Sequence, residues 1–402
     1  MKDEKKAPKL RFKSFTDDWE QCKLGDVYGH LYSGNTPSRK NSANFGGDTP
    51  WIRTADLNNG LIKSTTEFLT YEGIKQLKIL PENTIVLAMY GGFNQIGRTG
   101  ILGFPATINQ ALVALTPHKN INQFFAQSYL NRHIIDWRRV AASSRKDPNI
   151  TKEDVEKSEF SFGSLEEQNR ISKLISRLDH TITLHEEKKH QLERLKSALL
   201  QKMFADKSGY PAVRFEGFDE MWEYCKLEEV FVERNQKGVA DANYPLCSFI
   251  AHKGVVPKDK YDRSFLVKSD GKKYKRTELN DFIYSSNNLE TGSIGLNKFG
   301  RATISPVYSI FMVKGDSDFI AGLASTPRFI YEMIRFRQGV VYGQWRIHES
   351  DFLKIKYYIP QVTEQEKIGN LLSKLTRAII LHDRKSKLLL RVKQSLLQKM
   401  FI

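Results

Sequence analysis

Two stretches of the chain carry apolar residues at alternating spacings of four and three, the pattern of a helix that packs on another helix. The first stripe lies within residues 165–204 and consists of Ile171, Ile175, Leu178, Ile182, His185, Leu192, Leu195, Leu199 and Met203. The second lies within residues 362–401 and consists of Ile368, Leu372, Leu375, Ile379, His382, Leu389, Val392, Leu396 and Met400. Polar residues interrupt the stripes at Lys189 and Ser386. Because no single helix can bury such a stripe in water, the pattern predicts that the two helices pair as an antiparallel coiled coil.

The two helical stretches are the ends of two half-chains, because the sequence repeats itself. Residues 8–27 recur as residues 211–230 at an offset of 203, with ten identities in twenty positions that include a tryptophan and a cysteine. Residues 165–204 recur as residues 362–401 at an offset of 197, and both copies end in LLQKMF. The chain is therefore a tandem duplication in which each half consists of a leading segment, a globular domain and a helix.

The segments that precede the two helices have the composition of mixed domains. Short apolar runs such as residues 84–89 and 308–313 predict strands, whereas residues 121–135 and 328–337 predict helices. Each segment is therefore predicted to be a compact α+β domain.

A short alignment links the two globular segments. Ile96-Gly97 and the following Ala106-Thr-Ile correspond to Ile294-Gly295 and the following Ala302-Thr-Ile. This predicts two domains of similar fold with divergent loops, related by a pseudo-two-fold axis and separated by the paired helices. Drift after duplication is the alternative explanation for the divergence. The predicted boundaries are a first domain with its leading segment, a central helix, a second domain with its leading segment and a final helix, at residues 1–164, 165–207, 208–361 and 362–402.

The charge of the chain narrows the class of partner. It has 62 Lys and Arg residues against 46 Asp and Glu residues, a net charge of +16, which favours a polyanion and most simply nucleic acid. A basic protein without such a partner is the alternative. No apolar run long enough to span a bilayer occurs, the first residues do not resemble a secretory signal, and three cysteines cannot form a disulfide framework. These features predict a cytoplasmic protein.

Motifs for catalysis are weak or incomplete. Residues 92–99 resemble a phosphate-binding loop, but Arg98 stands in place of the lysine and strand-like residues follow, so a turn between strands is the better interpretation. The two Glu-x-Lys occurrences at 186–189 lie on a predicted helix and read as a solvated face, not as a nuclease site. His185 and His382 share one stripe position, where they are either a metal or pH-sensing pair or two core histidines that set the register. The chain is predicted to bind no metal and to carry no catalytic residue.

Basic and amide side chains gather instead in loops that contain turn residues. Lysine and arginine neutralise phosphates, and Arg, Asn and Gln can also read base edges. Any single surface lysine is more often only solubilising, so the set carries the prediction. The DNA-binding candidates in the first half are Arg39, Lys40, Arg53, Asn94, Gln95, Arg98, Arg145 and Lys146, and those in the second half are Lys253, Lys272, Lys273, Lys275, Arg276, Asn287, Asn288, Arg301, Gln344 and Arg346.

Several of these motifs together resemble the specificity (S) subunit of type I restriction–modification enzymes. The resemblance covers essentially the whole chain. It is carried by the duplicated Arg-Phe…Trp…Lys-Leu segments, the Gly34-Asn-Thr-Pro…Pro50-Trp-Ile…Asp56 stretch, the Gly343-Gln344 pair before Asp351, the Glu-Gln openings at 167–168 and 364–365, and the LLQKMF ends. Residues 144–150 are placed like residues 343–347 but lack the Gly-Gln pair, so no residue-level role is carried over there.

The resemblance implies a division of labour among subunits. Each globular domain would be a target-recognition domain that reads one half of a split double-stranded DNA target, and the helices would dock two modification subunits. Those subunits would hold S-adenosylmethionine, and added restriction subunits would use ATP and Mg²⁺, so this chain would bind no cofactor and would not be an enzyme. The competing hypotheses are a self-sufficient DNA methyltransferase or nuclease, and a coiled-coil scaffold without DNA function. A helix over 171–203 is about 50 Å long, which suits half-sites about one DNA turn apart with an unread gap between them.

Overall fold

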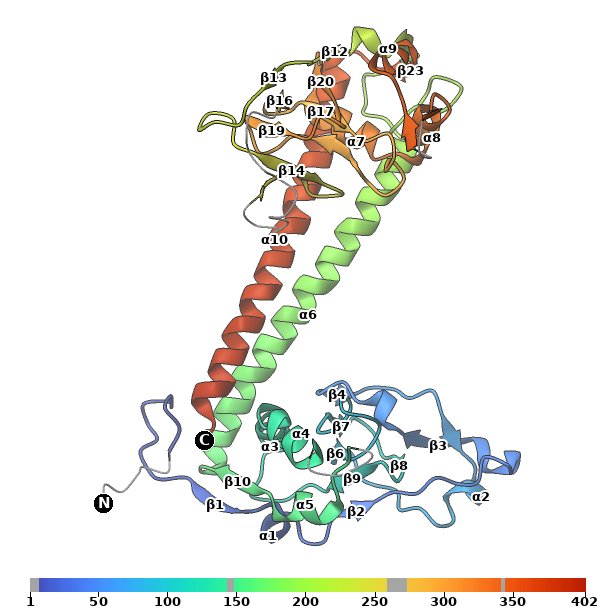
Figure 1. Ribbon diagram of the computed structural model, residues 1–402. Helices are drawn as coiled ribbons and strands as arrows, with labels where there is room; N and C mark the ends of the chain where they lie inside the picture. Colours follow the sequence, from blue (N-terminus) through green and yellow to red (C-terminus); the bar gives the residue numbers. More distant parts are fainter. Residues whose placement is uncertain (1–6, 143–147, 259–272, 341–343) are drawn as a thin grey trace. The chain divides into compact units, whose positions relative to one another are not determined.

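The computed structural model describes residues 7–142, 148–258, 273–340 and 344–402 (Figure 1). The chain divides into two compact units. Unit 1 comprises residues up to His185 together with Lys385–Ile402, and unit 2 comprises Glu186–Arg384. The chain has two long helices, α6 (Leu165–Lys202) and α10 (Val362–Met400). Each helix is divided between the units, so that one part of it belongs to unit 1 and the other part to unit 2. None of the helices in the described part of the chain is long and apolar enough to cross a membrane.

Unit 1 is built around a five-stranded sheet in which buried strands have apolar side chains on both faces. On β6, Ile85 and Leu87 join the core that contains the helices, whereas Val86 and Ala88 join a second core on the opposite face. The sheet order is β2 (Tyr32–Ser33), β9 (Leu112–Leu115), β6 (Ile85–Ala88), β7 (Thr99–Leu102) and β4 (Leu61–Ile62). All its pairs are antiparallel except β4 with β7.

A smaller sheet and several helices complete the globular part of unit 1. The smaller sheet has the order β5 (Phe68–Leu69), β3 (Phe45–Ile52) and β8 (Thr107–Ile108). The helices are α1 (Leu24–Tyr28), α2 (Tyr71–Ile74), α3 (Gln123–Arg132), α4 (Ile134–Ala142) and α5 (Lys152–Lys157). The helix α3 packs its buried Phe125 and Leu130 into the core beside Ile85 and Leu87.

Unit 2 repeats this arrangement with different loops. Its main sheet has the order β12 (Phe231–Glu233), β20 (Ser309–Val313), β17 (Phe282–Tyr284) and β18 (Ile294–Leu296), all antiparallel. That order matches β2, β9, β6 and β7 of unit 1. Its smaller sheet has the order β13 (Lys237–Gly238), β16 (Tyr274–Thr277) and β19 (Ala302–Ile304). The predicted pair of similar α+β domains is therefore confirmed.

The remaining elements of unit 2 are two hairpins and three helices. The hairpins are β14 (Cys247–Ile250) with β15 (Gly254–Pro257), and β21 (Gln338–Val340) with β22 (Gln344–Arg346). The helices are α7 (Ser317–Ala324), α8 (Pro327–Ile334) and α9 (Glu349–Lys354). One detail of the predicted alignment is wrong: Ile294-Gly295 lies within β18, whereas Ile96-Gly97 lies in the turn before β7. The loop between β6 and β7 is longer than the loop between β17 and β18, and this difference shifts the equivalent positions.

The repeated leading segment forms a strand that pairs with the strand directly before each long helix. In unit 1, β1 (Glu20–Lys23) pairs antiparallel with β10 (Glu159–Phe162), and Cys22 lies opposite Phe160. In unit 2, β11 (Glu223–Lys226) pairs with β23 (Lys356–Ile359), and Cys225 lies opposite Tyr357. In each unit the first repeated segment is thus paired with the strand that leads into the second repeated segment.

A buried ion pair joins the leading segment to the start of the helix in both units. Arg11 donates from Nε and Nη2 to the two carboxylate oxygens of Glu167 at 2.8 and 2.7 Å, and Trp19 Nε1 donates to the same carboxylate at 2.9 Å. Glu167 is fully buried. These hydrogen bonds raise the pKa of Arg11 above its ordinary value. The carboxylate in the first helical turn also suits the helix dipole.

The equivalent contacts in unit 2 have nearly the same geometry. Arg214 donates to both oxygens of Glu364 at 2.8 Å, and Trp222 Nε1 donates at 3.1 Å. The next residue, Gln365, accepts from the amide of Asp316 and donates to the carbonyl of Pro360. The repeated arginine, tryptophan, glutamate and glutamine therefore have a structural reason: they fasten each domain to its helix.

The long helices run antiparallel within each unit. In unit 1, Ile171 and Ile175 of α6 share a core with Met400, and Lys393 donates to Asp179 at 2.5 Å. In unit 2, Met203 lies in one core with Ile368 and Leu372, and Lys189 donates to Asp383 at 2.9 Å. The pairing predicted from the apolar stripes is therefore confirmed. Lys189 is half-buried in this ion pair, so the Glu-x-Lys stretch is not entirely a solvated face.

Two positions of the predicted stripes are wrong. Leu195 and Val392 are 48% and 40% exposed, whereas Lys196 and Lys393 are half-buried. The reason is helical phase: the 4,3 spacing that passes through Lys189 and Ser386 reaches 196 and 393. Of the other predicted stripe residues, Ile171, Ile175, Ile182, Ile368, Leu372 and Leu375 are buried, and Leu178, Leu192, Leu199, Ile379, Leu389 and Leu396 are half-buried. His185 and His382 are half-buried as well.

Candidate nucleic-acid interface

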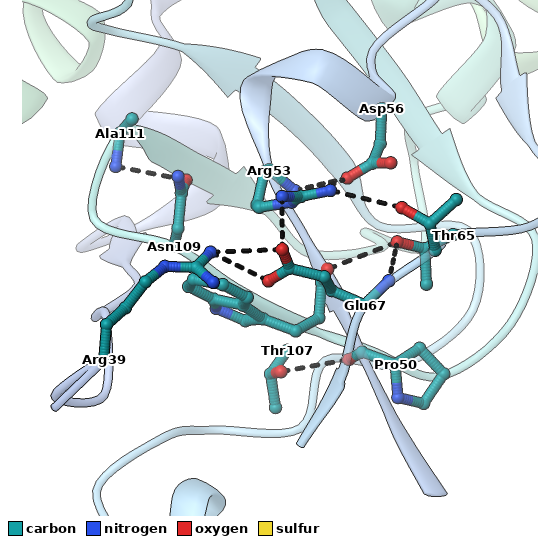
Figure 2. A network of polar contacts seen from close by, with 11 residues as sticks. Arg39, Pro50, Arg53, Asp56, Thr65, Glu67, Thr107, Asn109 and Ala111 are labelled. Carbon is teal, nitrogen blue, oxygen red and sulfur yellow. Dashed lines mark hydrogen bonds and ion pairs between the residues drawn. The ribbon is translucent and has the colours of Figure 1, made fainter. Parts of the chain in front are cut away.

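A cluster of two arginines and one carboxylate lies on the smaller sheet of unit 1 (Figure 2). Arg39 precedes β3, Arg53 follows it, and Glu67 precedes β5. Arg53 Nη1 donates to Glu67 Oε1 at 2.6 Å, and Arg39 Nη2 donates to Oε2 at 2.9 Å and to Oε1 at 3.2 Å. A single carboxylate thus holds two guanidinium groups.

The two arginines differ in what they leave open to solvent. The Arg39 side chain is 57% exposed, and its guanidinium lies 5.1 Å from the ring centre of Phe45 and 5.5 Å from that of Trp51. The Arg53 side chain is only 24% exposed, and its Nη2 donates to Thr66 Oγ1 at 3.3 Å. Arg39 therefore presents charge at the surface, whereas Arg53 is mostly used inside the domain.

Unit 2 carries a related cluster on its own smaller sheet. The Arg276 guanidinium, on β16, lies 4.3 Å from the ring centre of Tyr244, and that of Arg301, just before β19, lies 5.9 Å from it. Arg276 Nη2 donates to Asp241 Oδ2 at 2.9 Å. Tyr244 donates its hydroxyl to Glu278 at 2.8 Å, and this hydrogen bond raises the pKa of Tyr244. Aromatic rings thus lie against arginines beside the smaller sheet of each unit, although no alignment of the sequences relates these residues.

Some of the predicted DNA-binding residues are engaged inside their unit. Arg98 Nη1 donates to Gln95 Oε1 at 2.6 Å and Nη2 donates to the carbonyl of Leu57, so both side chains brace the turn between β6 and β7. That turn is not a helix opening, which agrees with its interpretation as a turn between strands. Lys275 is 7% exposed and donates to the carbonyl of Tyr308 and to Glu349.

The other predicted residues lie at exposed positions or outside the described part of the structure. Asn287 Oδ1 accepts from the amide of Trp345 at 2.6 Å, and Arg346 lies 3.6 Å from Glu349. Residues at exposed positions are Lys40, Asn94, Lys253, Lys273 and Asn288. Arg145, Lys146 and Lys272, together with the side chain of Gln344, lie outside the described part of the structure.

The sequence analysis missed the groups that hold the arginines. Glu67 lies 28 residues from Arg39 and 14 from Arg53, so no local sequence pattern predicts that it contacts either arginine. The aromatic supports are also non-local, because Trp51 stands 12 residues after Arg39 and Tyr244 stands 32 residues before Arg276. It also missed the exposed Phe93, whose ring lies 5.8 Å from the Arg138 guanidinium, and the half-exposed Trp345.

Within the described residues, neither the cysteine thiols nor the metal-ligating side chains are arranged for catalysis. Burial raises the pKa of Cys225 to about 11 and also raises the pKa of Cys22, which disfavours the nucleophilic thiolate. No three His, Cys, Asp or Glu side chains of the described ranges cluster closely enough to hold a metal ion. The arrangement is therefore suited to binding an anion through arginines.

Comparisons with known proteins found similar sequences and a similar fold. Residues 16–194 match the family described as "Type I restriction modification DNA specificity domain". The chain is 25% identical over 226 residues to the type I restriction enzyme MjaIX specificity subunit of Methanocaldococcus jannaschii, covering 53% of this chain and 51% of that one. It is 28% identical over 179 residues to the EcoR124I/EcoR124II specificity subunit of Escherichia coli, covering 42% and 43%. The chain thus spans about half the length of the curated relatives it matches.

A solved structure shares the fold over nearly the whole chain. The S subunit of a type I restriction–modification system from M. genitalium matches with a TM-score of 0.63 and 15% identity. The match covers 98% of this chain and 99% of that one. The duplicated α+β fold with two long helices is therefore shared with a known S subunit.

Proposed function

We propose that this chain is the specificity subunit of a type I restriction–modification complex, because residues 16–194 match the family of type I restriction–modification DNA specificity domains. Each globular domain would read one half of a split double-stranded DNA target. The domains would be residues 1–164 and 208–361, linked by the helices at 165–207 and 362–402.

The observation that carries this proposal is the pair of arginine–aromatic clusters, one beside the smaller sheet of each unit. Arg39 lies against Phe45 and Trp51 in unit 1, and Arg276 lies against Tyr244 in unit 2, so each unit places a guanidinium against aromatic rings beside its smaller sheet. Guanidinium groups contact both phosphates and base edges. The net charge of +16 supports the same partner.

The modification subunits would dock on the long helices. Both helices expose large apolar side chains outside their paired stripe, namely Leu184 and Leu195 on α6 and Leu381, Leu388 and Val392 on α10. These exposed side chains are the apolar contacts that the proposal assigns to the modification subunits. The chain would therefore be a non-catalytic adaptor, with S-adenosylmethionine on the two modification subunits and with ATP and Mg²⁺ on added restriction subunits.

Co-expression with a type I modification subunit, followed by methylome sequencing, tests the proposal. The expected result is adenine methylation at a bipartite target with an unread gap, and a single continuous site would contradict it. Exchanging residues 28–164 for another such domain should change one half-site only; a change in both half-sites would overturn the assignment of one domain to one half-site.

Two further measurements separate the competing functions. The isolated chain with S-adenosylmethionine and Mg²⁺ should neither methylate nor cut DNA, whereas a self-sufficient enzyme would do so. The affinity of the complex for DNA should fall steeply with salt because phosphate contacts release counterions. A scaffold without DNA function would show no such dependence.

A further inference from the structure

We infer that Arg39 reads a guanine in the half-site of unit 1 and that Glu67 positions it for this contact. The inference rests on the proposed function, because it names one base contact within the proposed DNA surface. It assigns different roles to three neighbouring charged groups: Arg39 as the reader, Glu67 as the positioning residue and Lys40 as a phosphate contact.

The guanidinium of Arg39 is held in place without DNA. It lies 5.1 and 5.5 Å from the ring centres of Phe45 and Trp51. Its Nη2 donates to both oxygens of Glu67 (Figure 2). Within the described residues, Nη2 is the only nitrogen of this side chain that donates a hydrogen bond, while the side chain is 57% exposed. A guanidinium has five N–H donors, so a fixed group keeps donors free on Nη1 and Nε.

Guanine is the base that suits such a group. In the major groove it presents two neighbouring acceptors, O6 and N7, and arginine contacts to this pair are the commonest specific contact. Because Nη1 and Nε lie on different edges of the guanidinium and Nη2 is engaged by Glu67, Nη1 is the nitrogen that we expect to donate to this pair. A guanidinium that is already oriented loses less side-chain freedom on binding than a free one. Lys40, the next residue, is exposed and carries a point charge on a flexible stem, which suits a phosphate.

Glu67 is itself held by Arg53. Arg53 donates from Nη1 to Glu67 and from Nη2 to Thr66, and its backbone amide donates to Asp56 at 2.8 Å. The Arg53 side chain therefore holds the Glu67 carboxylate in place, and that carboxylate in turn holds the Arg39 guanidinium. Glu67 also offsets one of the two guanidinium charges, which weakens the attraction to phosphates of any sequence.

Three variants of the full chain, assembled with a type I modification subunit, separate these roles. The variants are Arg39→Lys, the matched control Lys40→Ala, and Glu67→Gln. For each, the affinity is measured for the duplex that the wild type selects from a randomised library, for its single-base-pair substitutions, and at several salt concentrations. Thermal unfolding of each variant checks that the domain is folded.

Arg39→Lys should remove the preference for guanine at one base pair of one half-site, where the wild type discriminates by about 5- to 150-fold. Its salt dependence should stay unchanged because the charge is kept. Lys40→Ala should weaken binding to all sequences alike and reduce the salt slope by about one. If Arg39 contacts a phosphate instead, Arg39→Lys will leave every base preference unchanged, and the inference is overturned.

Glu67→Gln should reduce discrimination at the same base pair and raise the affinity for unrelated DNA. In the Arg39→Lys background it should add no further loss, because residues that act through one another are not additive. A purely structural role for Glu67 would lower the unfolding temperature and leave the base preference intact, which would refute the positioning role. A wild type that selects no sequence would refute the proposed function, whereas selection with all preferences intact in Arg39→Lys would refute only the inference.

Discussion

The core of unit 1 contains a residue from the far end of the sequence, and the substitution Phe401→Ala tests its contribution. Phe401 is 5% exposed. Its ring centre lies 5.2 Å from that of Phe125, 6.0 Å from that of Tyr129 and 6.3 Å from that of Trp19. The leading segment, the α3 helix and the end of α10 therefore meet at one aromatic side chain.

The expected cost follows from this burial. Truncating a buried phenylalanine to alanine costs about 3–5 kcal/mol, since the transfer free energy and a cavity both count. Each of the edge-to-face contacts adds about 0.5–1.5 kcal/mol beyond the buried area. We therefore expect a loss of at least about 3 kcal/mol, a large part of the 5–15 kcal/mol that is typical of a domain. A loss of this size raises the equilibrium constant for opening of the domain by about 100-fold.

Hydrogen exchange of the full chain, resolved by peptide, measures this loss in each unit separately. Protection of β6 and β9 should fall about 100-fold in Phe401→Ala, whereas β17 and β20 should be unchanged. The matched control is Phe204→Ala, because Phe204 is 7% exposed and packs on Phe319 in unit 2. It should show the reverse pattern. Equal losses in both units, or none in unit 1, would refute the assignment of residues 385–402 to the core of unit 1.

Three further predictions concern the helices and their attachment. Glu364→Gln should destabilise unit 2 by about 3 kcal/mol, measured by urea unfolding, because it leaves the Arg214 charge buried without its partner; a neutral effect would show that the ion pair is dispensable. Counting seven residues along each helix from the Lys189–Asp383 pair places Thr376 opposite Lys196. Burial lowers the pKa of Lys196, so unfolding stability should rise with pH up to the ordinary lysine pKa of about 10.4. Thr376→Asp should add an ion pair worth about 0.5–1 kcal/mol and abolish that rise, and an unchanged pH profile would contradict the register. Leu375→Asp should prevent pairing of the helices by burying a charge, which circular dichroism and loss of assembly with the modification subunit would report; an intact complex would refute it.

The helices were predictable because their signal is local. Residues 165–204 and 362–401 carry a periodic apolar pattern, and helical geometry turns such spacing into one buried face. The same local reasoning failed at Leu195 and Val392, where an apolar residue lies one position away from the buried phase. Apolar character alone could not show which neighbour faces the other helix.

For the DNA-binding candidates, the sequence predicted a group of basic residues but not the role of each one. Lys273 and Lys275 look alike in the sequence, yet the first is exposed and the second is buried against Glu349. Likewise, Arg39 and Arg53 look equivalent until Glu67 and the aromatic rings distinguish them. Partners 14 to 74 residues away decide these roles, and no spacing rule connects residues so far apart.

By itself the sequence determined the duplication, the two paired helices and the positive charge, because repeats, periodicity and composition are properties of neighbouring residues or of sums over the chain. Only the tertiary structure decided that the repeated arginine and glutamate form one buried pair in each unit, and that the end of each long helix completes the core of the other domain. It also decided which arginine keeps free donors at the surface. These features depend on which segments, distant in the sequence, lie within a few ångströms of each other. That proximity determines which side chains are buried and which hydrogen bonds form.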